Sequence, residues 1–335
     1  MIGQFILQIL GITKGRILSR PSVKLSRENI SDVLILKDNT YILTYTPSYG
    51  CTGLANSGGD VFVAPCPPDS DGDGDEMSMV TENGETFTHT IFLSEFTEKP
   101  DNHQIIGINP KIAIELMESI LEKNLISCLP GVKEIKRNVS MFLEGKVDSS
   151  FSFVGICDDD VPFVMEVSNV PFAEYKTEDL PEIKAMKDRQ RERIMRAIEI
   201  AMASEDTLIP KPSGDEEDDS FYNLKTSYFP EVNHKCVSPE LIKRINEMAN
   251  IAKESSVRCI LGYVVQRTDI HQFEISSHNK EYYNAVANAV ASGVFIVPVI
   301  VSWTAEGVSF FVTDQLPVVQ PTLQEPTTLQ EPTTL

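Results

Sequence analysis

The sequence lacks the cysteine patterns of a structural metal site or a disulfide framework. None of its six cysteines forms a C-x-x-C pair and their spacing is irregular, which argues against structural zinc. With no recognisable secretory leader, six cysteines in a chain of this size favour reduced thiols in an intracellular protein, cytoplasmic or nuclear. They are Cys51, Cys66, Cys128, Cys157, Cys236 and Cys259.

Positive charge and long apolar runs are also scarce. The 335 residues include 29 Lys and Arg against 49 Asp and Glu, a net charge of −20. A chain this acidic is not held to nucleic acid by its overall charge, so such binding needs a local basic patch. The longest apolar run, near 294–301, contains Pro298 and falls far short of the ~20 residues of a membrane span. We therefore expect no membrane partner.

Motifs of common catalytic and metal sites are missing. There is no G-x-S-x-G, no H-E-x-x-H and no phosphate-binding loop, and no two histidines are spaced as a metal pair on one helix face. Asp69, Asp71 and Asp73 match the start of a calcium loop, but Val80 stands where that loop needs a bidentate carboxylate. A solvated acidic loop is favoured, and no cofactor is expected.

The pattern that is present predicts two domains of different type. At ~150 residues per domain the length suggests about two. Short alternating segments over 11–66, with a turn at Asp38 and Asn39, predict a small β-barrel. We expect this barrel over 1–108, interrupted by an acidic loop at 67–85.

The basic N-terminal stretch has two interpretations. Residues 1–27 carry five basic residues and no acidic one, which fits an organelle transit peptide. The alternative is a basic first strand of the folded domain. Pro21 interrupts any long amphipathic helix and favours the strand.

The second half predicts an α/β domain over 109–317. Helices are expected from Pro110, over 238–254 and over 280–291, a hairpin from 149–156 and 162–170, and strands over 259–265 and 294–303. Residues 174–225 look like an insertion. The tail at 318–335 repeats a six-residue Pro, Thr and Gln unit and is expected to be disordered.

The insertion contains a basic amphipathic helix at 182–203. Such a helix can dock a protein partner, although it more commonly packs one face and exposes the other. Its basic residues are Lys184, Lys187, Arg189, Arg191, Arg193 and Arg196.

A series of short motifs resembles the sugar fermentation stimulation protein (SfsA) family over 11–174 and 226–317. Their order and spacing carry the resemblance, because each motif alone is weak. The motifs are Pro47-Ser48-Tyr49-Gly50-Cys51-Thr52-Gly53-Leu54, Thr88-His89-Thr90, Asn109-Pro110, Met165-Glu166-Val167-Ser168, Tyr228-Phe229-Pro230-Glu231 and Gly293-Val294.

The resemblance implies a fold, a ligand and a set of binding residues. The fold would be an N-terminal OB-like β-barrel followed by a restriction-endonuclease-like (PD-(D/E)xK type) α/β domain, and the associated activity is DNA binding. By position, the basic first strand would be Lys14, Arg16 and Arg20, and a glycine turn would comprise Pro47, Gly50 and Gly53, with Ser48 where the family usually has Asn.

The resemblance also implies that the nuclease-like centre is degenerate. Such a centre needs one acid on a first strand and a Glu-x-Lys on the next, with the two acids holding Mg²⁺. The positions fall on Ser152, Glu166 and Ser168, and an upstream glutamate falls near Asn138. Asp148 lies four residues from Ser152, ~13 Å along a strand, too far to replace its ligand. Only Glu166 remains of the catalytic set.

Three functions follow as hypotheses. We favour nucleic-acid binding, consistent with a regulatory role, by a protein that is not an enzyme. A metal-dependent nuclease with displaced ligands, the one case that would need Mg²⁺, is the first alternative. An acidic protein-interaction scaffold is the second.

Overall fold

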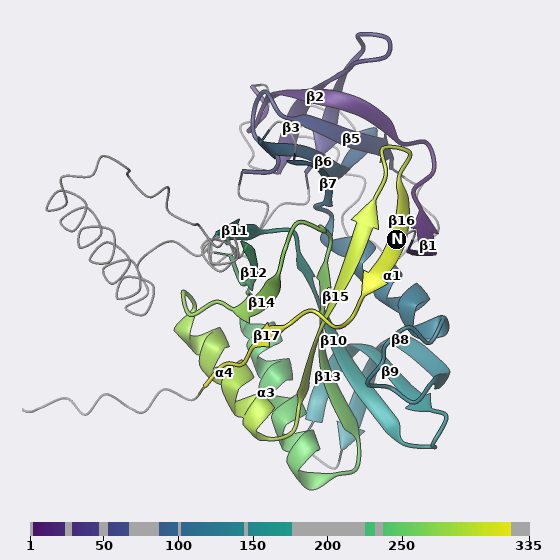
Figure 1. Ribbon diagram of the computed structural model, residues 1–335, viewed down its shortest axis with the longest axis vertical. Coiled ribbons are helices and arrows are strands. Elements are labelled where there is room, and N and C mark those ends of the chain that lie inside the picture. The colour runs from purple at the N-terminus through teal and green to yellow at the C-terminus, as the bar shows by residue number, and fades with distance from the viewer. Residues whose placement is uncertain are drawn as a thin grey trace, which may run out of the picture. The chain divides into compact units, whose positions relative to one another are not determined.

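The computed structural model describes residues 3–23, 29–46, 53–66, 87–99, 102–143, 147–175, 225–231 and 237–322 (Figure 1). The acidic loop at 67–85, the basic helix at 182–203 and the tail beyond 322 lie outside these ranges. The chain divides into two compact units, one of 1–172 with 227–335 and one of 173–226. In the second unit the structure describes β11 (Ala173–Tyr175) and the start of β12, where Lys225 Nζ lies 5.3 Å from the centroid of the Tyr175 ring.

The N-terminal strands close into a barrel. The sheet has the order β4-β3-β2-β5-β6-β7, and β4 also pairs in parallel with β6, which closes five of the strands on themselves. This closed five-stranded arrangement fits the predicted OB-like barrel. The strands are β2 (Thr13–Ser19), β3 (Ile30–Ile35), β4 (Tyr41–Tyr45), β5 (Asp60–Pro65), β6 (His89–Lys99) and β7 (Asn102–Gly107).

Alternating side chains fill the barrel. Ile17, Val33, Val61, Ile91 and Ile106 are fully buried in one apolar cluster. Gly15 lets β2 and β3 approach closely, because a Cβ there would lie 2.5 Å from Cγ1 of Val33. The period-two pattern of the sequence therefore places one face of each strand inside the barrel.

The second half is built on a seven-stranded sheet with the order β1-β16-β15-β13-β10-β9-β8. The predicted hairpin is confirmed, since β9 and β10 pair antiparallel. β10, β13 and β15 are parallel to one another. The strands are β8 (Val132–Leu143), β9 (Val147–Cys157), β10 (Pro162–Val170), β13 (Arg258–Val265), β15 (Phe295–Trp303) and β16 (Val308–Thr313). The restriction-endonuclease-like class of this half stays a prediction.

The first strand of the chain belongs to this second sheet, which differs from the expected barrel range of 1–108. β1 (Gln4–Gln8) pairs antiparallel with β16. Its side chain Ile6 is buried in the large apolar cluster of the second half, and this burial outweighs proximity in the chain. Residues 4–8 and 13–19 are thus strands of the folded domain, as the second interpretation of the N-terminus had it.

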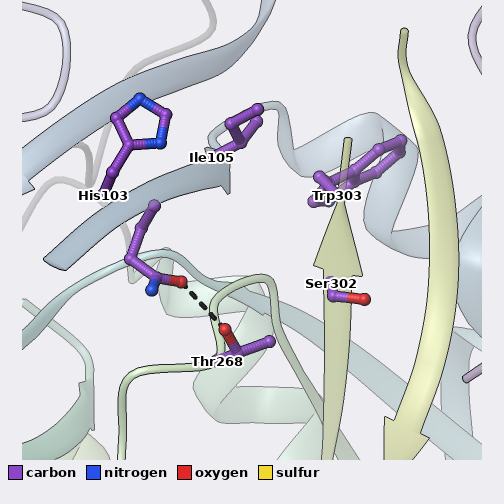
Figure 2. A pocket seen from close by; sticks show the side chains of 6 residues that line it. His103, Ile105, Thr268, Ser302 and Trp303 are labelled. Carbon is purple, nitrogen blue, oxygen red and sulfur yellow. Dashed lines mark hydrogen bonds between the residues drawn. The ribbon is translucent and has the colours of Figure 1, made fainter. Parts of the chain in front are cut away.

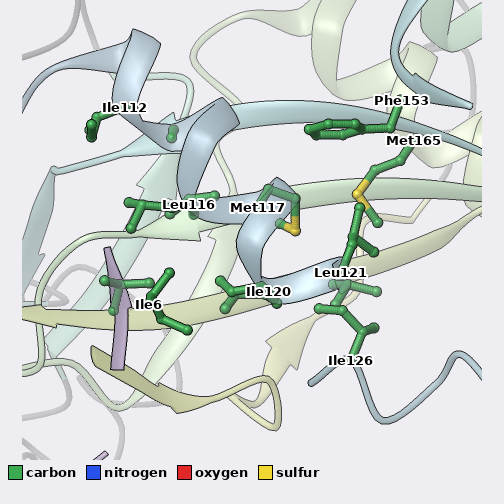
Figure 3. Close-up of a cluster of buried hydrophobic side chains, with 14 of the residues drawn as sticks. Ile6, Ile112, Leu116, Met117, Ile120, Leu121, Ile126, Phe153 and Met165 are labelled. Atoms are coloured by element: carbon green, nitrogen blue, oxygen red, sulfur yellow. The ribbon is translucent and has the colours of Figure 1, made fainter. Parts of the chain in front are cut away.

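Helices cover both faces of the seven-stranded sheet. α1 (Pro110–Glu122) packs Leu116 and Met117 on the face that also buries Met165 of β10 (Figure 3). The next residue of β10, Glu166, contacts α3 (Pro239–Glu254). Because successive strand side chains point to opposite faces, α1 and α3 lie on opposite sides of the sheet.

The predicted starts of the three helices are confirmed, and each is capped by a side chain. Asn109, Ser238 and Asn279 each accept a hydrogen bond from the first turn of α1, α3 and α4 (Lys280–Ala291). β12 (Lys225–Phe229), β14 (Gln272–Ile275) and β17 (Val318–Val319) form a further small sheet. In the described part of the chain, no helix combines the length and the apolar character that a membrane crossing requires.

Candidate functional site

Three adjacent strands bring the predicted nuclease-like positions together. Asn138 lies on β8 between the pairs Arg137–Phe153 and Val139–Phe151, which places it beside Ser152 of β9. The backbone N of Ser152 donates to Oε2 of Glu166 on β10 at 3.3 Å. Asn138, Ser152 and Glu166 therefore form one row across the sheet, in the order that the resemblance implies.

The side chain of Ser152 is engaged with the backbone. Its Oγ accepts a hydrogen bond from the N–H of Val167 at 3.1 Å, and the residue is buried. A carboxylate here would face Glu166, whereas the serine hydroxyl adds no charge. Asp148 lies at the far end of the continuous strand β9, paired with Phe142, and so stays distant from this row.

Arg244 of α3 is the positive charge that contacts Glu166. Its Nη2 lies 3.2 Å from Oε1 of Glu166, and its Nη1 lies 3.4 Å from the carbonyl O of Ser150. Sequence reasoning missed this residue. The available signal was its helix position, three residues after Leu241 and four before Met248, both buried on the face toward the sheet.

Burial governs the ionisation of Glu166. The residue is 5% exposed, and burial raises the pKa of its carboxyl, while the charge of Arg244 and the hydrogen bond from Ser152 act in the opposite direction. The pKa remains above its ordinary value. The site is therefore a single carboxylate whose charge is balanced by one guanidinium.

Ser168 lies on the same strand face as Glu166, beside an aromatic cluster. It pairs in register with Tyr263 of β13. The hydroxyl groups of Tyr263 and Tyr282 are 2.7 Å apart, and Phe229 packs against both rings. Burial raises the pKa of Tyr263, so this phenol stays neutral. Ser168 itself supplies neither a cation nor a base at the expected lysine position.

These residues do not fit a divalent metal ion. Mg²⁺ and Ca²⁺ are bound by several oxygen ligands, usually including more than one carboxylate. In the row of Asn138, Ser152 and Glu166 one carboxylate is present, and a guanidinium already lies against it. Among the residues that the structure describes, no group of three or more His, Cys, Asp or Glu side chains could hold a metal ion.

The predicted basic strand is present, but its charges are paired. Arg16 makes two hydrogen bonds to Asp60, at 2.6 and 3.1 Å, and Lys14 forms ion pairs with Asp60 and Glu95. Arg16 accordingly lowers the pKa of Asp60. Burial alone would raise the pKa of Glu95, but hydrogen bonds from Lys14 and His103 keep it below its ordinary value.

The structure describes two of the remaining predicted binding residues, Arg20 and Gly53. Arg20 Nη1 donates to the carbonyl O of Ala55 at 3.1 Å. Gly53 has a φ of +82° with open space around its Cα, which suits a glycine turn. Pro47 and Gly50 lie outside the described residues.

Comparison with known proteins agrees with this arrangement. Residues 225–307 match the family model described as the sugar fermentation stimulation protein RE domain. Over these residues the chain is similar to the SfsA family. A solved structure of Pyrococcus furiosus SfsA in complex with Ca²⁺ matches with a TM-score of 0.61 and 14% identity, covering 94% of this chain and 99% of that one. A search of curated proteins found no match.

The family match covers α3, β13, α4 and β15, the segment that carries Arg244 and Tyr263. The structural match extends the likeness in fold to the barrel and to the strands of Ser152 and Glu166. The SfsA resemblance predicted from the short motifs is thus confirmed.

Proposed function

We propose that this SfsA-like chain binds nucleic acid and does not cleave it. The observation that carries the proposal is the ion pair between Glu166 and Arg244 beside Ser152. A guanidinium lies against the one carboxylate of this row, and the resemblance places a serine, Ser152, where a cleaving centre would have its second acid. The charges found together here are those of one carboxylate and one guanidinium, a neutral pair.

Two features support binding as the retained activity. The closed barrel has the arrangement of OB-like domains, which commonly bind single strands. The strand β2 carries Lys14 and Arg16 on its exposed side. A phosphate backbone can replace Asp60 and Glu95 there as the partner of these two cations. Such contacts are electrostatic and depend on salt.

The loss of cleavage follows from the charges at the site. Glu166 alone cannot balance a divalent ion, and Ser168 cannot stabilise developing negative charge as an ammonium does. Removing one preorganised group of this kind typically costs ~10²–10³ in rate. Two such losses leave activity near background.

The test is a combined binding and cleavage assay. Single-stranded and double-stranded DNA are incubated with the full chain at low salt, with and without Mg²⁺ or Mn²⁺, and both retention and nicking are measured. We expect binding that weakens with salt and no metal-dependent nicking. Nicking that Glu166→Gln abolishes would overturn the proposal and establish a nuclease.

A metal-dependent nuclease is the second candidate, because the Pyrococcus furiosus relative was solved in complex with Ca²⁺. Its displaced ligands would have to come from residues other than Ser152 and Ser168, and the same nicking assay decides the matter. The third candidate, an acidic scaffold, is favoured by the pairing of Lys14 and Arg16 with carboxylates. It predicts no DNA binding at any salt concentration.

A further inference from the structure

A small cavity lies between the barrel strand β7 and the ends of strands of the second sheet (Figure 2). Its volume is about 270 Å³. That is just below the roughly 300–1,000 Å³ of pockets for drug-sized ligands, so it suits a single ring system. The lining residues are His103, Gln104, Ile105, Thr268, Ser302 and Trp303.

Hydrogen bonds hold the walls of this cavity in place. The Thr268 hydroxyl donates to Oε1 of Gln104 at 2.8 Å, which ties the two walls together. Trp303 Nε1 donates to Oε1 of Gln266 at 2.9 Å, and the fully buried Gln266 also accepts at its backbone O from the N–H of Gly107 at 3.1 Å. The pocket is thus preformed rather than created by side-chain rearrangement.

The chemistry of the lining selects a neutral, planar ligand with hydrogen-bonding edges. Among the described residues neither lysine nor arginine lines the cavity, so the lining gives a phosphate no cation to pair with. Gln104, Thr268 and Ser302 offer a carboxamide and two hydroxyls, groups that pair with the edges of nucleobases. The His103 side chain is 48% exposed, which leaves a ring available for stacking.

The cavity is connected to the basic strand through Glu95. His103 Nε2 lies 2.5 Å from Oε1 of Glu95, and Oε2 of the same carboxylate pairs with Lys14. Lys14 in turn lies 3.4 Å from Asp60, the partner of Arg16. Only Glu95 therefore separates Lys14 from His103 of the pocket, so a nucleic-acid backbone that followed Lys14 and Arg16 would pass close to the pocket.

We propose that this cavity is a subsite for one nucleobase of a single-stranded nucleic acid. The base stacks on His103, and its edge hydrogen-bonds with Gln104 and Thr268. This inference rests on the proposed nucleic-acid binding. It adds the place at which a base is recognised and the requirement that the strand be single. A base paired within a duplex cannot enter, so the subsite favours single strands.

The single tryptophan of the chain, Trp303, provides a direct probe because it lines the cavity. Intrinsic fluorescence is recorded while an oligothymidylate, an oligodeoxyadenylate or an oligoadenylate about 12 nucleotides long is added, within the site size of such barrels. Binding is measured in parallel by anisotropy of a labelled strand. We expect the Trp303 emission to change with the same midpoint as the anisotropy, whereas a duplex of equal length leaves it unchanged.

Substitutions separate stacking from general effects. His103→Ala is expected to weaken single-strand binding about five-fold or more, the lower end of the contribution of one stacked base. His103→Phe keeps an aromatic ring but loses the pairing with Glu95, and should bind like the parent chain. Thr268→Val should also reduce affinity, whereas Thr322→Val, a matched change at an exposed position, should not.

The outcomes distinguish this inference from the proposed function. Single-strand binding with unchanged Trp303 emission, or with full affinity in His103→Ala, would overturn the subsite and leave the proposed function standing. A loss of affinity in His103→Phe as large as in His103→Ala would also overturn it, since the ion pair rather than stacking would then be responsible. Absence of binding by any DNA or RNA would overturn both.

Discussion

The buried Glu166 forms a charge pair with Arg244, whose side chain is partly exposed. Breaking such a pair by removing one partner is costly, because the remaining charge has lost its compensation. Burial raises the pKa of Glu166, so its ionised form is less favourable in the folded chain than in the unfolded one. The penalty is absent where the carboxyl is protonated in both states, and it grows as the pH rises above ~4.3.

Arg244→Ala is therefore expected to destabilise the chain in a pH-dependent way. The loss at neutral pH should be about 3 kcal/mol, the lower end for a broken buried pair, because Arg244 is partly exposed. It should shrink as the pH falls toward ~4, because a carboxyl with a raised pKa is already protonated there in the folded chain. Urea unfolding at the two pH values measures both. Lys243→Ala, at an exposed neighbour on the same helix, serves as control and should change stability little.

Asp32 is a buried carboxylate of the barrel, and its pKa is shifted in the opposite direction to that of Glu166. Burial alone would raise its pKa, but hydrogen bonds from Ser19, Tyr41, Ser22 and the N–H of Val23 lower it below the ordinary value. A lowered folded pKa gives stability that is present above the unfolded value and is lost as the pH falls through the folded one.

Asp32→Asn should accordingly cost about 2 kcal/mol at neutral pH, since one charged acceptor is replaced by a neutral amide that accepts fewer bonds. The difference from the parent chain should diminish as the pH falls below ~3.9, the unfolded value, and through the lower folded pKa, where the aspartate itself becomes protonated. Thermal melts across this pH range test it. An equal difference at every pH would show that shape, not charge, accounts for the effect.

At the level of secondary-structure elements, β2 combines the predicted binding residues with their own counter-charges. Lys14 and Arg16 are matched by Asp60 of β5 and Glu95 of β6, so these four side chains carry no net charge together. A phosphate backbone must compete with those carboxylates. Binding through β2 is therefore expected to be weak and steeply dependent on salt.

The triple variant Lys14→Ala, Arg16→Ala and Arg20→Ala should lower DNA affinity at low salt. The slope of log affinity against log salt should flatten by about 0.7–0.9 for each phosphate contact that is lost. A matched control removes three positive charges from β8 with Lys133→Ala, Lys136→Ala and Arg137→Ala. Equal losses in both triple variants would mean that overall charge, not β2, determines binding.

For the whole molecule, the net charge of −20 opposes any polyanion. A large part of that charge is concentrated in two acidic runs, with six acidic residues in 69–82 and five in 215–219. Long-range repulsion from these runs is screened within about 8–10 Å at physiological salt. Their influence on binding should therefore be confined to low ionic strength.

Replacing the acidic residues of both runs by Asn and Gln should raise DNA affinity at low salt, with little gain at high salt. Anisotropy titrations over a salt series measure the effect. Replacing a similar number of uncharged surface residues provides the control. Unchanged or reduced affinity would indicate that the runs serve protein partners, as the scaffold hypothesis predicts.

Local sequence signals predicted the elements well where they depend on neighbouring residues. Asn109-Pro110 and Ser238-Pro239 begin α1 and α3 because capping and a fixed proline φ act within one turn. The turn at 158–160 predicted the hairpin that holds Ser152 beside Glu166. The strand β1, in contrast, joins a sheet whose other members lie far along the chain, and no local pattern indicates that partner.

The periodicity, the caps and the identity of the side chains follow from the order of the amino acids alone. They include Ser152 and Ser168, which the resemblance places at the positions of an acid and a lysine. Those properties are local, and the hydrogen bonds and side-chain faces that express them span only a few residues. Tertiary structure alone decided that Arg244 neutralises Glu166, that Asp60 and Glu95 compensate β2, and that six residues of distant segments enclose one cavity. Charge pairing and enclosure depend on distances in space, which only the packing of the sheets establishes.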